Sequence, residues 1–252
     1  MKIRINKLLR NGKTLFLAYD QGLELGPTEF NDKNVDPLYI IKIAKEGKYN
    51  GLIVQKGIAQ KYLKEIKESK VPLIVKLNGK ANIRKGEPLS TQLCTVEEAR
   101  ELGASAVGFT IYLGSQFESL MLKEFESIQA EAHKHGLPVI AWIYPRGKSI
   151  KGRSSKDLLA YACRVGLEIG ADIIKVKSEG CNLLELKWAI KSAGRTKVVL
   201  AGGAKINEAG FLKGVSQALK AGACGIAVGR NVWKSKDPAK LSKSLKDLVF
   251  GK

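Results

Sequence analysis

The chain has 252 residues, of which 44% are hydrophobic, and a formal net charge of +19. This length is typical of a single α/β barrel, and the apolar content is enough for a sizeable core. No apolar run approaches the ~20 residues that a membrane-spanning helix requires, so we expect no integral membrane protein. The basic N-terminus lacks a long apolar segment and a small-residue cleavage site, so we expect no signal peptide.

The four cysteines are widely spaced and form no CxxC pair; they are Cys94, Cys163, Cys181 and Cys224. This spacing favours reduced, buried thiols in a cytoplasmic protein over a disulfide framework. The lysines spread from Lys2 to Lys252 without an arginine-rich tail, many at helix-surface spacing, as in QKYLKEIKESK. That pattern favours solvated helix faces, and nucleic acid is an unlikely partner because no zinc-finger, RRM-like or basic-zipper pattern is present.

Short β-branched or aliphatic runs alternate with amphipathic stretches along the chain. The runs predict strands at 15–20, 51–55, 72–77, 106–113, 138–144, 172–177, 197–202 and 225–230. The amphipathic stretches predict helices at 36–48, 58–69, 95–103, 117–136, 155–170, 183–194, 207–222 and 237–250. Several of these end at a glycine, as a helix C-cap favours: Gly103, Gly136, Gly170, Gly194 and Gly222.

Strict strand–helix alternation indicates a parallel sheet with helices outside it. Eight such units in about 250 residues predict an α/β fold, a single-domain (β/α)8 barrel over residues 1–252. An open doubly wound sheet is the alternative, but its usual GxGxxG after the first strand is absent. The longest irregular stretch, residues 78–95, follows the third strand, and we expect a lid or a substrate-contacting loop there.

Chemistry-bearing residues gather at the predicted carboxyl ends of the strands, where barrel active sites lie. In strand order they are Asp20; Lys76 and Asn78; Trp142, Tyr144 and Arg146; Lys175 and Lys177; Gly202 and Gly203; and Gly229 and Arg230. A closed barrel would bring them to one pocket.

Two lysines in the apolar run ADIIKVK point the same way, because residues two apart in a strand share a face. Desolvation and a cationic neighbour both lower a lysine's pKa and free the neutral amine to attack a carbonyl. Lys175 is therefore a candidate nucleophile, with Lys177 or Arg146 as its cationic neighbour. The alternative is that both lysines reach past the barrel rim into water.

The glycine turns after the last two strands suit a phosphate, because backbone N–H groups in these loops form a common barrel anion site. Tight turns alone are the alternative. The two histidines, His133 and His135, end a predicted helix away from the strand ends. Helix capping explains them better than metal binding, so we expect no metal.

Six segments resemble archaeal-type class I fructose-1,6-bisphosphate aldolase: LAYDQGLELGP, LIVKLNGKANIRKGEP, VIAWIYPRGKSI, GADIIKVK, VVLAGGAK and GIAVGRNVW. The similarity runs over about residues 12 to 235. It implies a cytoplasmic, metal-independent (β/α)8 barrel, usually a larger homo-oligomer, that reversibly cleaves fructose 1,6-bisphosphate. It implies no cofactor, since the substrate itself forms a covalent imine with the enzyme.

The resemblance also implies roles for single residues. Lys175 matches the family's Schiff-base lysine, Tyr144 its main proton donor and acceptor, and Asp20 its acidic residue after the first strand. Trp142 matches an aromatic residue that lines the sugar pocket. The phosphate site is implied at Gly202, Gly203, Gly229 and Arg230, with Arg146 holding the other phosphate.

Three departures from the family pattern leave the preferred sugar open. Ser178 stands where tyrosine is common, Leu25 where a histidine is, and AGGAK replaces SGGPK. The nearest alternative is a sister aldolase or transaldolase that makes 2-amino-3,7-dideoxy-D-threo-hept-6-ulosonate in archaeal aromatic biosynthesis, although Trp142 favours the bisphosphate. A thiolase acting on a phosphorylated signalling sugar, and a non-catalytic binder of a phosphosugar or nucleic acid, are more distant alternatives.

Overall fold

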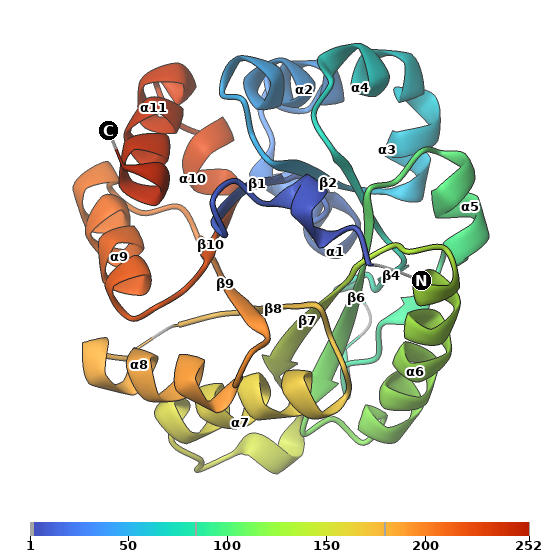
Figure 1. The fold of residues 1–252 in the computed structure, drawn as a ribbon, viewed down its shortest axis with the longest axis vertical. Helices are drawn as coiled ribbons and strands as arrows, with labels where there is room; N and C mark the ends of the chain where they lie inside the picture. The colour runs from blue at the N-terminus through green and yellow to red at the C-terminus, as the bar shows by residue number, and fades with distance from the viewer. Residues whose placement is uncertain (1–2, 84, 179, 252) are drawn as a thin grey trace.

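Eight parallel strands close into a barrel with helices around it (Figure 1). The computed structural model describes residues 3–83, 85–178 and 180–251. Around the barrel the order is β1-β2-β3-β6-β7-β8-β9-β10, and β10 pairs with β1 to close it. The strands are β1 Thr14–Ala18, β2 Gly51–Gln55, β3 Leu73–Lys76, β6 Ala106–Leu113, β7 Val139–Pro145, β8 Ile173–Val176, β9 Lys197–Ala201 and β10 Gly225–Val228. The (β/α)8 prediction is confirmed, and the open-sheet alternative is wrong.

The outer helices follow the predicted stretches, and none of those in the described part of the chain is long and apolar enough to cross a membrane. They are α2 Pro37–Glu46, α3 Lys56–Lys61, α4 Leu63–Ser69, α5 Val96–Glu101, α6 Glu118–Lys134, α7 Ser155–Glu168, α8 Leu183–Ser192, α9 Glu208–Lys220 and α11 Pro238–Phe250. The stretch 58–69 is divided between α3 and α4, because the backbone leaves the helical region at Tyr62 (φ −117°, ψ 27°).

Glycine ends five of these helices, as predicted. Gly103, Gly136, Gly170, Gly194 and Gly222 all have positive φ, between 57° and 105°. Glycine reaches this region without the steric cost that a Cβ brings, so it lets the chain turn sharply back toward the next strand.

Short helices that the sequence analysis missed lie in loops at the carboxyl ends of the strands. Helix α1 (Gly22–Leu25) and the 3-10 helix η2 (Gly26–Glu29) follow β1, and α10 (Arg230–Trp233) follows β10. Each has four residues, too few to give a hydrophobic period. They position side chains at the mouth of the barrel.

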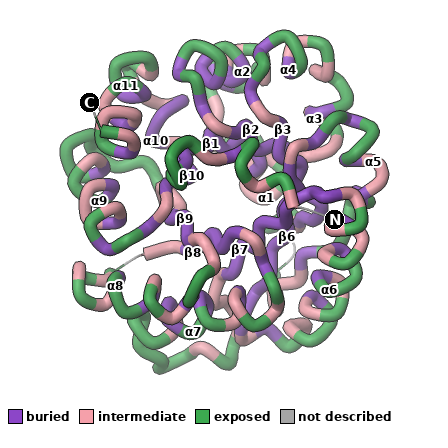
Figure 2. The backbone as a smooth tube through the Cα atoms, viewed as in Figure 1, coloured by how far each residue is buried: buried purple, intermediate pink, exposed green. Residues whose placement is uncertain are grey.

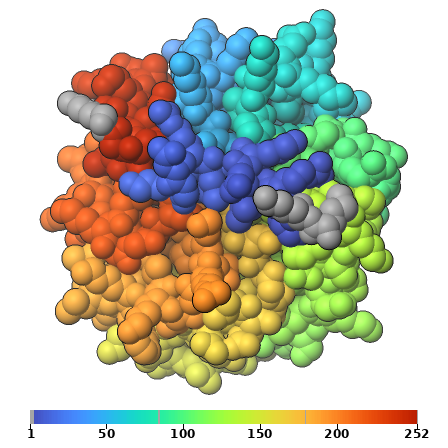
Figure 3. Space-filling model, viewed as in Figure 1, coloured from blue at the N-terminus to red at the C-terminus, as the bar shows by residue number. Residues whose placement is uncertain are grey.

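The strands are buried and the outward helix faces are exposed (Figure 2). A separate cluster fills the barrel itself, and its members are Leu8, Phe16, Ala18, Ile53, Ile74, Ala106, Ile140, Trp142, Ile173, Val199 and Ala227. Leu8 belongs to the 3-10 helix η1 (Ile5–Leu8), which precedes β1. Residues 3–13, in blue, lie across the centre of the barrel end seen in Figure 3. Arg4 N donates to the carbonyl of Gly136, just before β7, so this is the amino end of the strands.

Candidate active site

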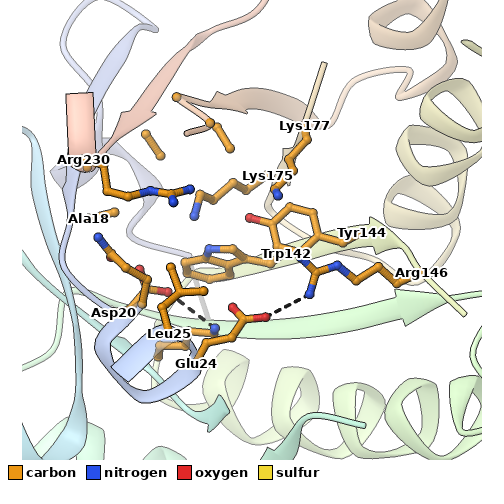
Figure 4. Close-up of a pocket in the computed structure, with 17 residues that line it drawn as sticks. Ala18, Asp20, Glu24, Leu25, Trp142, Tyr144, Arg146, Lys175, Lys177 and Arg230 are labelled. Atoms are coloured by element: carbon orange, nitrogen blue, oxygen red, sulfur yellow. Dashed lines mark hydrogen bonds and ion pairs between the residues drawn. The ribbon is translucent and has the colours of Figure 1, made fainter. Parts of the chain in front are cut away.

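A cavity of about 160 Å³ opens at the carboxyl ends of the strands (Figure 4). It is lined by most of the residues predicted for the site, namely Asp20, Trp142, Tyr144, Arg146, Lys175, Gly202, Gly203, Gly229 and Arg230. So do Gln21, Glu24, Leu25, Lys76 and Lys177 line it. Barrel closure therefore gathers side chains from β1, β3, β7, β8, β9 and β10 around one space. The prediction for Asn78 is wrong: its amide bonds to the backbone of Ser90 and Thr110, and it does not reach the cavity.

Lys175 lies on β8 and is buried, with 6% of its surface exposed. Its Nζ is 4.9 Å from the centroid of the Trp142 ring. Desolvation by burial, together with the charges of Lys76 and Lys177, lowers the pKa of Lys175 to about 8, although the charge of Asp20 opposes this change. Roughly a tenth of the molecules then carry a neutral amine at pH 7, far more than for an exposed lysine.

The sequence predicts Lys177 or Arg146 as the cationic neighbour of Lys175. The charge of Lys177 does lower the pKa of Lys175, but the second cation that lowers it is Lys76 rather than Arg146. The sequence carried a signal for Lys76, because a charged residue interrupts the apolar strand PLIVKL.

Asp20 follows β1 and is paired with Lys76, whose Nζ lies 3.4 Å from its Oδ2. Burial by itself raises the pKa of Asp20. The positive charges of Lys76 and Lys175 outweigh that effect and hold its pKa below the usual value. Asp20 is therefore an anion held between two lysines, able to accept a proton or to stabilise a positive charge.

Tyr144 lies on β7, and its hydroxyl points into the cavity on the side of Lys175 (Figure 4). Burial raises the pKa of Tyr144 well above its ordinary value, and the charges of Asp20 and Glu24 raise it further. Lys177 Nζ lies 5.5 Å from the centroid of its ring. The hydroxyl thus stays protonated at neutral pH, as a proton donor must.

Trp142 forms the floor of the cavity, with 1% of its surface exposed. The neighbouring strand β6 makes room for it at Gly108, where a Cβ would lie 1.7 Å from the indole ring. An apolar aromatic floor desolvates the lysine above it.

Two backbone turns, after β9 and after β10, form one end of the cavity. Asn231 joins them: its Nδ2 donates to the carbonyls of Gly202 (2.8 Å) and Ala204 (2.9 Å), and its Oδ1 accepts from Ile206 N. Gly203 has a φ of 70°, and a Cβ at Gly229 would lie 2.9 Å from the Ala18 carbonyl oxygen. Glycine is therefore required at both positions. The absence of side chains leaves the backbone accessible from the cavity, which suits an anionic ligand. The sequence pattern did not predict this role of Asn231.

Arg146 lies opposite Arg230, with Trp142 between them in Figure 4. Its Nη1 is 2.9 Å from Glu24 Oε1. Glu24 was also missed, although it follows Asp20 closely in the first strand-end loop.

The stretch 78–95 was predicted to be a lid or a substrate-contacting loop. It forms a small hairpin, β4 (Asn78–Gly79) with β5 (Thr91–Gln92), and none of its described residues lines the cavity. The Asn78 side chain is buried against the backbone of Thr110 and Ser90. Contact between this loop and a substrate stays a prediction.

The two histidines lie at the amino ends of the strands, away from the cavity. His133 Nε2 is 2.8 Å from Asp172 Oδ2, so its side chain bonds to the turn before β8 rather than capping its own helix. Among residues 3–83, 85–178 and 180–251, no cluster of three His, Cys, Asp or Glu side chains could hold a metal ion.

Fold and site together define a (β/α)8-barrel protein with a buried amine of lowered pKa beside two glycine turns. Over residues 14–235 the chain matches the profile of the DeoC/LacD family aldolases. The chain belongs to this family.

Individual relatives agree with that assignment. Fructose-bisphosphate aldolase class 1 of Thermoproteus tenax is 46% identical over 245 residues, covering 96% of this chain and 91% of that protein. A solved archaeal fructose-1,6-bisphosphate aldolase, whose catalytic lysine is covalently bound to the carbinolamine intermediate, superposes with a TM-score of 0.93 at 45% identity and covers 98% of both chains. The 2-amino-3,7-dideoxy-D-threo-hept-6-ulosonate synthase 1 of Archaeoglobus fulgidus is 29% identical over 248 residues, covering 98% of this chain and 90% of that protein.

Proposed function

We propose that this protein is a class I aldolase that reversibly cleaves fructose 1,6-bisphosphate to dihydroxyacetone phosphate and glyceraldehyde 3-phosphate. The observation that carries the proposal is Lys175, a buried lysine whose pKa is lowered to about 8. The similarity to aldolases with a covalently modified lysine supports it.

The reaction begins at the amine. Neutral Lys175 attacks the C2 ketone to give a carbinolamine, and the oxygen takes up a proton. Loss of water, with the hydroxyl protonated through Tyr144, leaves an iminium on Lys175. This cation draws electrons from the C3–C4 bond, which is the chemical purpose of forming the imine.

The carbon–carbon bond then breaks. A base, Asp20 or Tyr144, removes the proton of the C4 hydroxyl, the C3–C4 electrons pass into the enamine, and glyceraldehyde 3-phosphate leaves. Tyr144 protonates C3 of the enamine. Hydrolysis of the resulting iminium returns Lys175 as a free amine and releases dihydroxyacetone phosphate.

The anion-binding groups lie on both sides of Lys175. The phosphate on C1, next to the carbon that Lys175 attacks, is assigned to Gly202, Gly203, Gly229 and Arg230, and Arg146 to the phosphate on C6. Trp142 supports the sugar chain between them. No metal and no organic cofactor takes part in this mechanism.

The proposal extends to domain organisation, oligomeric state and location in the cell. The whole chain, 1–252, is one barrel domain that works as a homo-oligomer in the cytoplasm. The alternative activity, synthesis of a seven-carbon precursor, would use the same lysine and tyrosine. The higher identity to fructose-bisphosphate aldolases, 46% against 29%, favours cleavage of the bisphosphate.

Borohydride trapping tests the proposal. The protein is incubated with dihydroxyacetone phosphate, reduced, digested and analysed by mass spectrometry, with a Lys175→Met variant as the control. We expect a reduced adduct on Lys175 and none in the control. An adduct on Lys177 would overturn the assignment of the nucleophile. A folded protein without any adduct would point instead to a non-catalytic binder.

A further inference from the structure

The two arginines assigned to phosphates are both bound by glutamates of one short stretch, residues 21–29, which we call the acidic segment. Glu24 Oε1 lies 2.9 Å from Arg146 Nη1, and Glu29 Oε1 lies 3.0 Å from Arg230 Nη1. The segment comprises Gln21, α1 and η2 in the loop that follows β1. One piece of chain therefore reaches both ends of the cavity.

Glu24 is held in place on several sides. The Tyr112 hydroxyl donates to Glu24 Oε1 at 3.3 Å, and the backbone carbonyl of Glu24 accepts from Asn82 N at 3.2 Å. Arg146 also lies over the Tyr112 ring, with Cζ 5.5 Å from the ring centroid. Glu24, Arg146 and Tyr112 thus form one three-residue contact at the cavity wall.

Glu29 uses both of its oxygens. Oε1 accepts from Arg230, and Oε2 accepts from Lys234 Nζ at 2.8 Å. These bonds lower the pKa of Glu29 and keep it ionised, and the bond from Lys234 has the largest effect. Since Arg230 begins helix α10 and Lys234 follows it, Glu29 anchors the arginine to the loop after β1.

A carboxylate beside a phosphate site needs a physical reason, because it repels the ligand. A guanidinium carries five N–H donors in a rigid fork. With Nη1 occupied by the glutamate, Nη2 and Nε remain for a phosphate, so one arginine can bridge both anions. The repulsion is offset if the glutamate removes the rotamer freedom that a long, half-exposed side chain otherwise loses on binding.

We propose that Glu24 and Glu29 are positioning residues that hold Arg146 and Arg230 for the two phosphates, and that Glu24, through Arg146, selects a ketose with two terminal phosphates over one with a single phosphate. This inference rests on the proposed function. Glu29 acts at the end that receives the phosphate on C1, which both kinds of ketose carry. Glu24 acts at the end that receives the phosphate on C6, which only the bisphosphate carries.

The test measures kcat and KM for fructose 1,6-bisphosphate and for fructose 1-phosphate with Glu24→Gln, Glu24→Asp and Glu29→Gln. For Glu24→Gln we expect kcat/KM to fall about tenfold with the bisphosphate, mainly through KM, and by less than about twofold with the monophosphate. Glu29→Gln should weaken both substrates alike. Glu24→Asp keeps the charge but is too short for Arg146, so it should behave as Glu24→Gln does.

Glu101→Gln, an exposed glutamate on α5, is the control for loss of one negative charge. Tighter binding of the bisphosphate by Glu24→Gln would mean that the glutamate only repels phosphate, and it would overturn the proposal. Equal losses with both substrates in Glu24→Gln would do the same. Borohydride trapping with dihydroxyacetone phosphate, which lacks the second phosphate, should still give an adduct on Lys175 in Glu24→Gln. Failure of trapping in the parent protein would instead count against the proposed function.

Discussion

At the scale of single residues, Lys76 controls the electrostatic surroundings of the candidate nucleophile, Lys175. It lies at the end of β3, is buried, and pairs with Asp20. It therefore acts on Lys175 in two ways: its own charge disfavours a second ammonium nearby, and it takes up part of the negative charge of Asp20. Both effects keep the pKa of Lys175 low.

Replacing Lys76 with methionine should raise the pKa of Lys175, because Asp20 then has Lys175 as its main counter-charge. Activity needs the neutral amine, so kcat/KM of the parent should rise with pH up to about 8, the pKa of Lys175. In Lys76→Met the rise should move to higher pH, and a move by one pH unit should leave about tenfold less activity at pH 7. The measurement is the pH dependence of kcat/KM.

Lys80→Met is the matched control, since Lys80 bonds to Asn82 on the hairpin loop and lies outside the cavity. Its pH profile should equal that of the parent. An unchanged or lowered inflection in Lys76→Met would show that Lys76 does not control the amine.

At the scale of elements, β6 and β7 together position Trp142. The strands pair with Gly108 opposite Ile140 and Thr110 opposite Trp142, so Gly108 lies two residues along β6 from the tryptophan's partner, on the same face. The indole covers Gly108 so closely that a Cβ there would lie 1.7 Å from the ring. The floor of the cavity thus depends on a residue of the neighbouring strand that does not line it.

Gly108→Ala should push the Trp142 ring upward into the cavity, because the backbone of a barrel strand cannot retreat. Overpacking of this kind typically costs about 1–3 kcal/mol of stability. We expect kcat/KM to fall at least about tenfold and the intrinsic fluorescence of the tryptophans to change. Gly214→Ala on α9 is the control: a Cβ there meets nothing within 4 Å, and loss of a helical glycine should stabilise slightly. Parent-like activity of Gly108→Ala would contradict this account of the floor.

The elements themselves could be read from the sequence because their signals are local. Each of the barrel strands forms within two residues of its predicted bounds, since a buried parallel strand is a continuous apolar run. The short helices α1 and α10 could not be predicted, because four residues give no period and their conformation depends on packing across the barrel mouth. Glu24 and Asn231 were missed for the same reason: their roles arise from partners more than twenty residues away in sequence.

At the scale of the whole molecule, the barrel separates stability from chemistry at its two ends. The carboxyl end holds the cavity, with Lys175 and Asp20. The amino end is covered by residues 3–13 (Figure 3), and Leu8 among them is fully buried in the cluster that fills the barrel. The Thr14 hydroxyl donates to the Leu8 carbonyl at 2.7 Å and fixes this segment to the start of β1.

Leu8→Ala should therefore lower the free energy of unfolding without altering catalysis. Removing a fully buried leucine costs about 2–5 kcal/mol, because transfer free energy is lost and a cavity remains. Urea unfolding checks the loss, and kcat/KM at a temperature where the variant is fully folded checks the activity. Leu248→Ala, a leucine that is 37% exposed on α11, is the control and should change stability far less. If Leu8→Ala reduced kcat/KM while folded, the two ends of the barrel would be coupled through the interior cluster. That cluster contains both Leu8 and Trp142, so its packing is a continuous route by which a change at the closed end could reach the floor of the cavity.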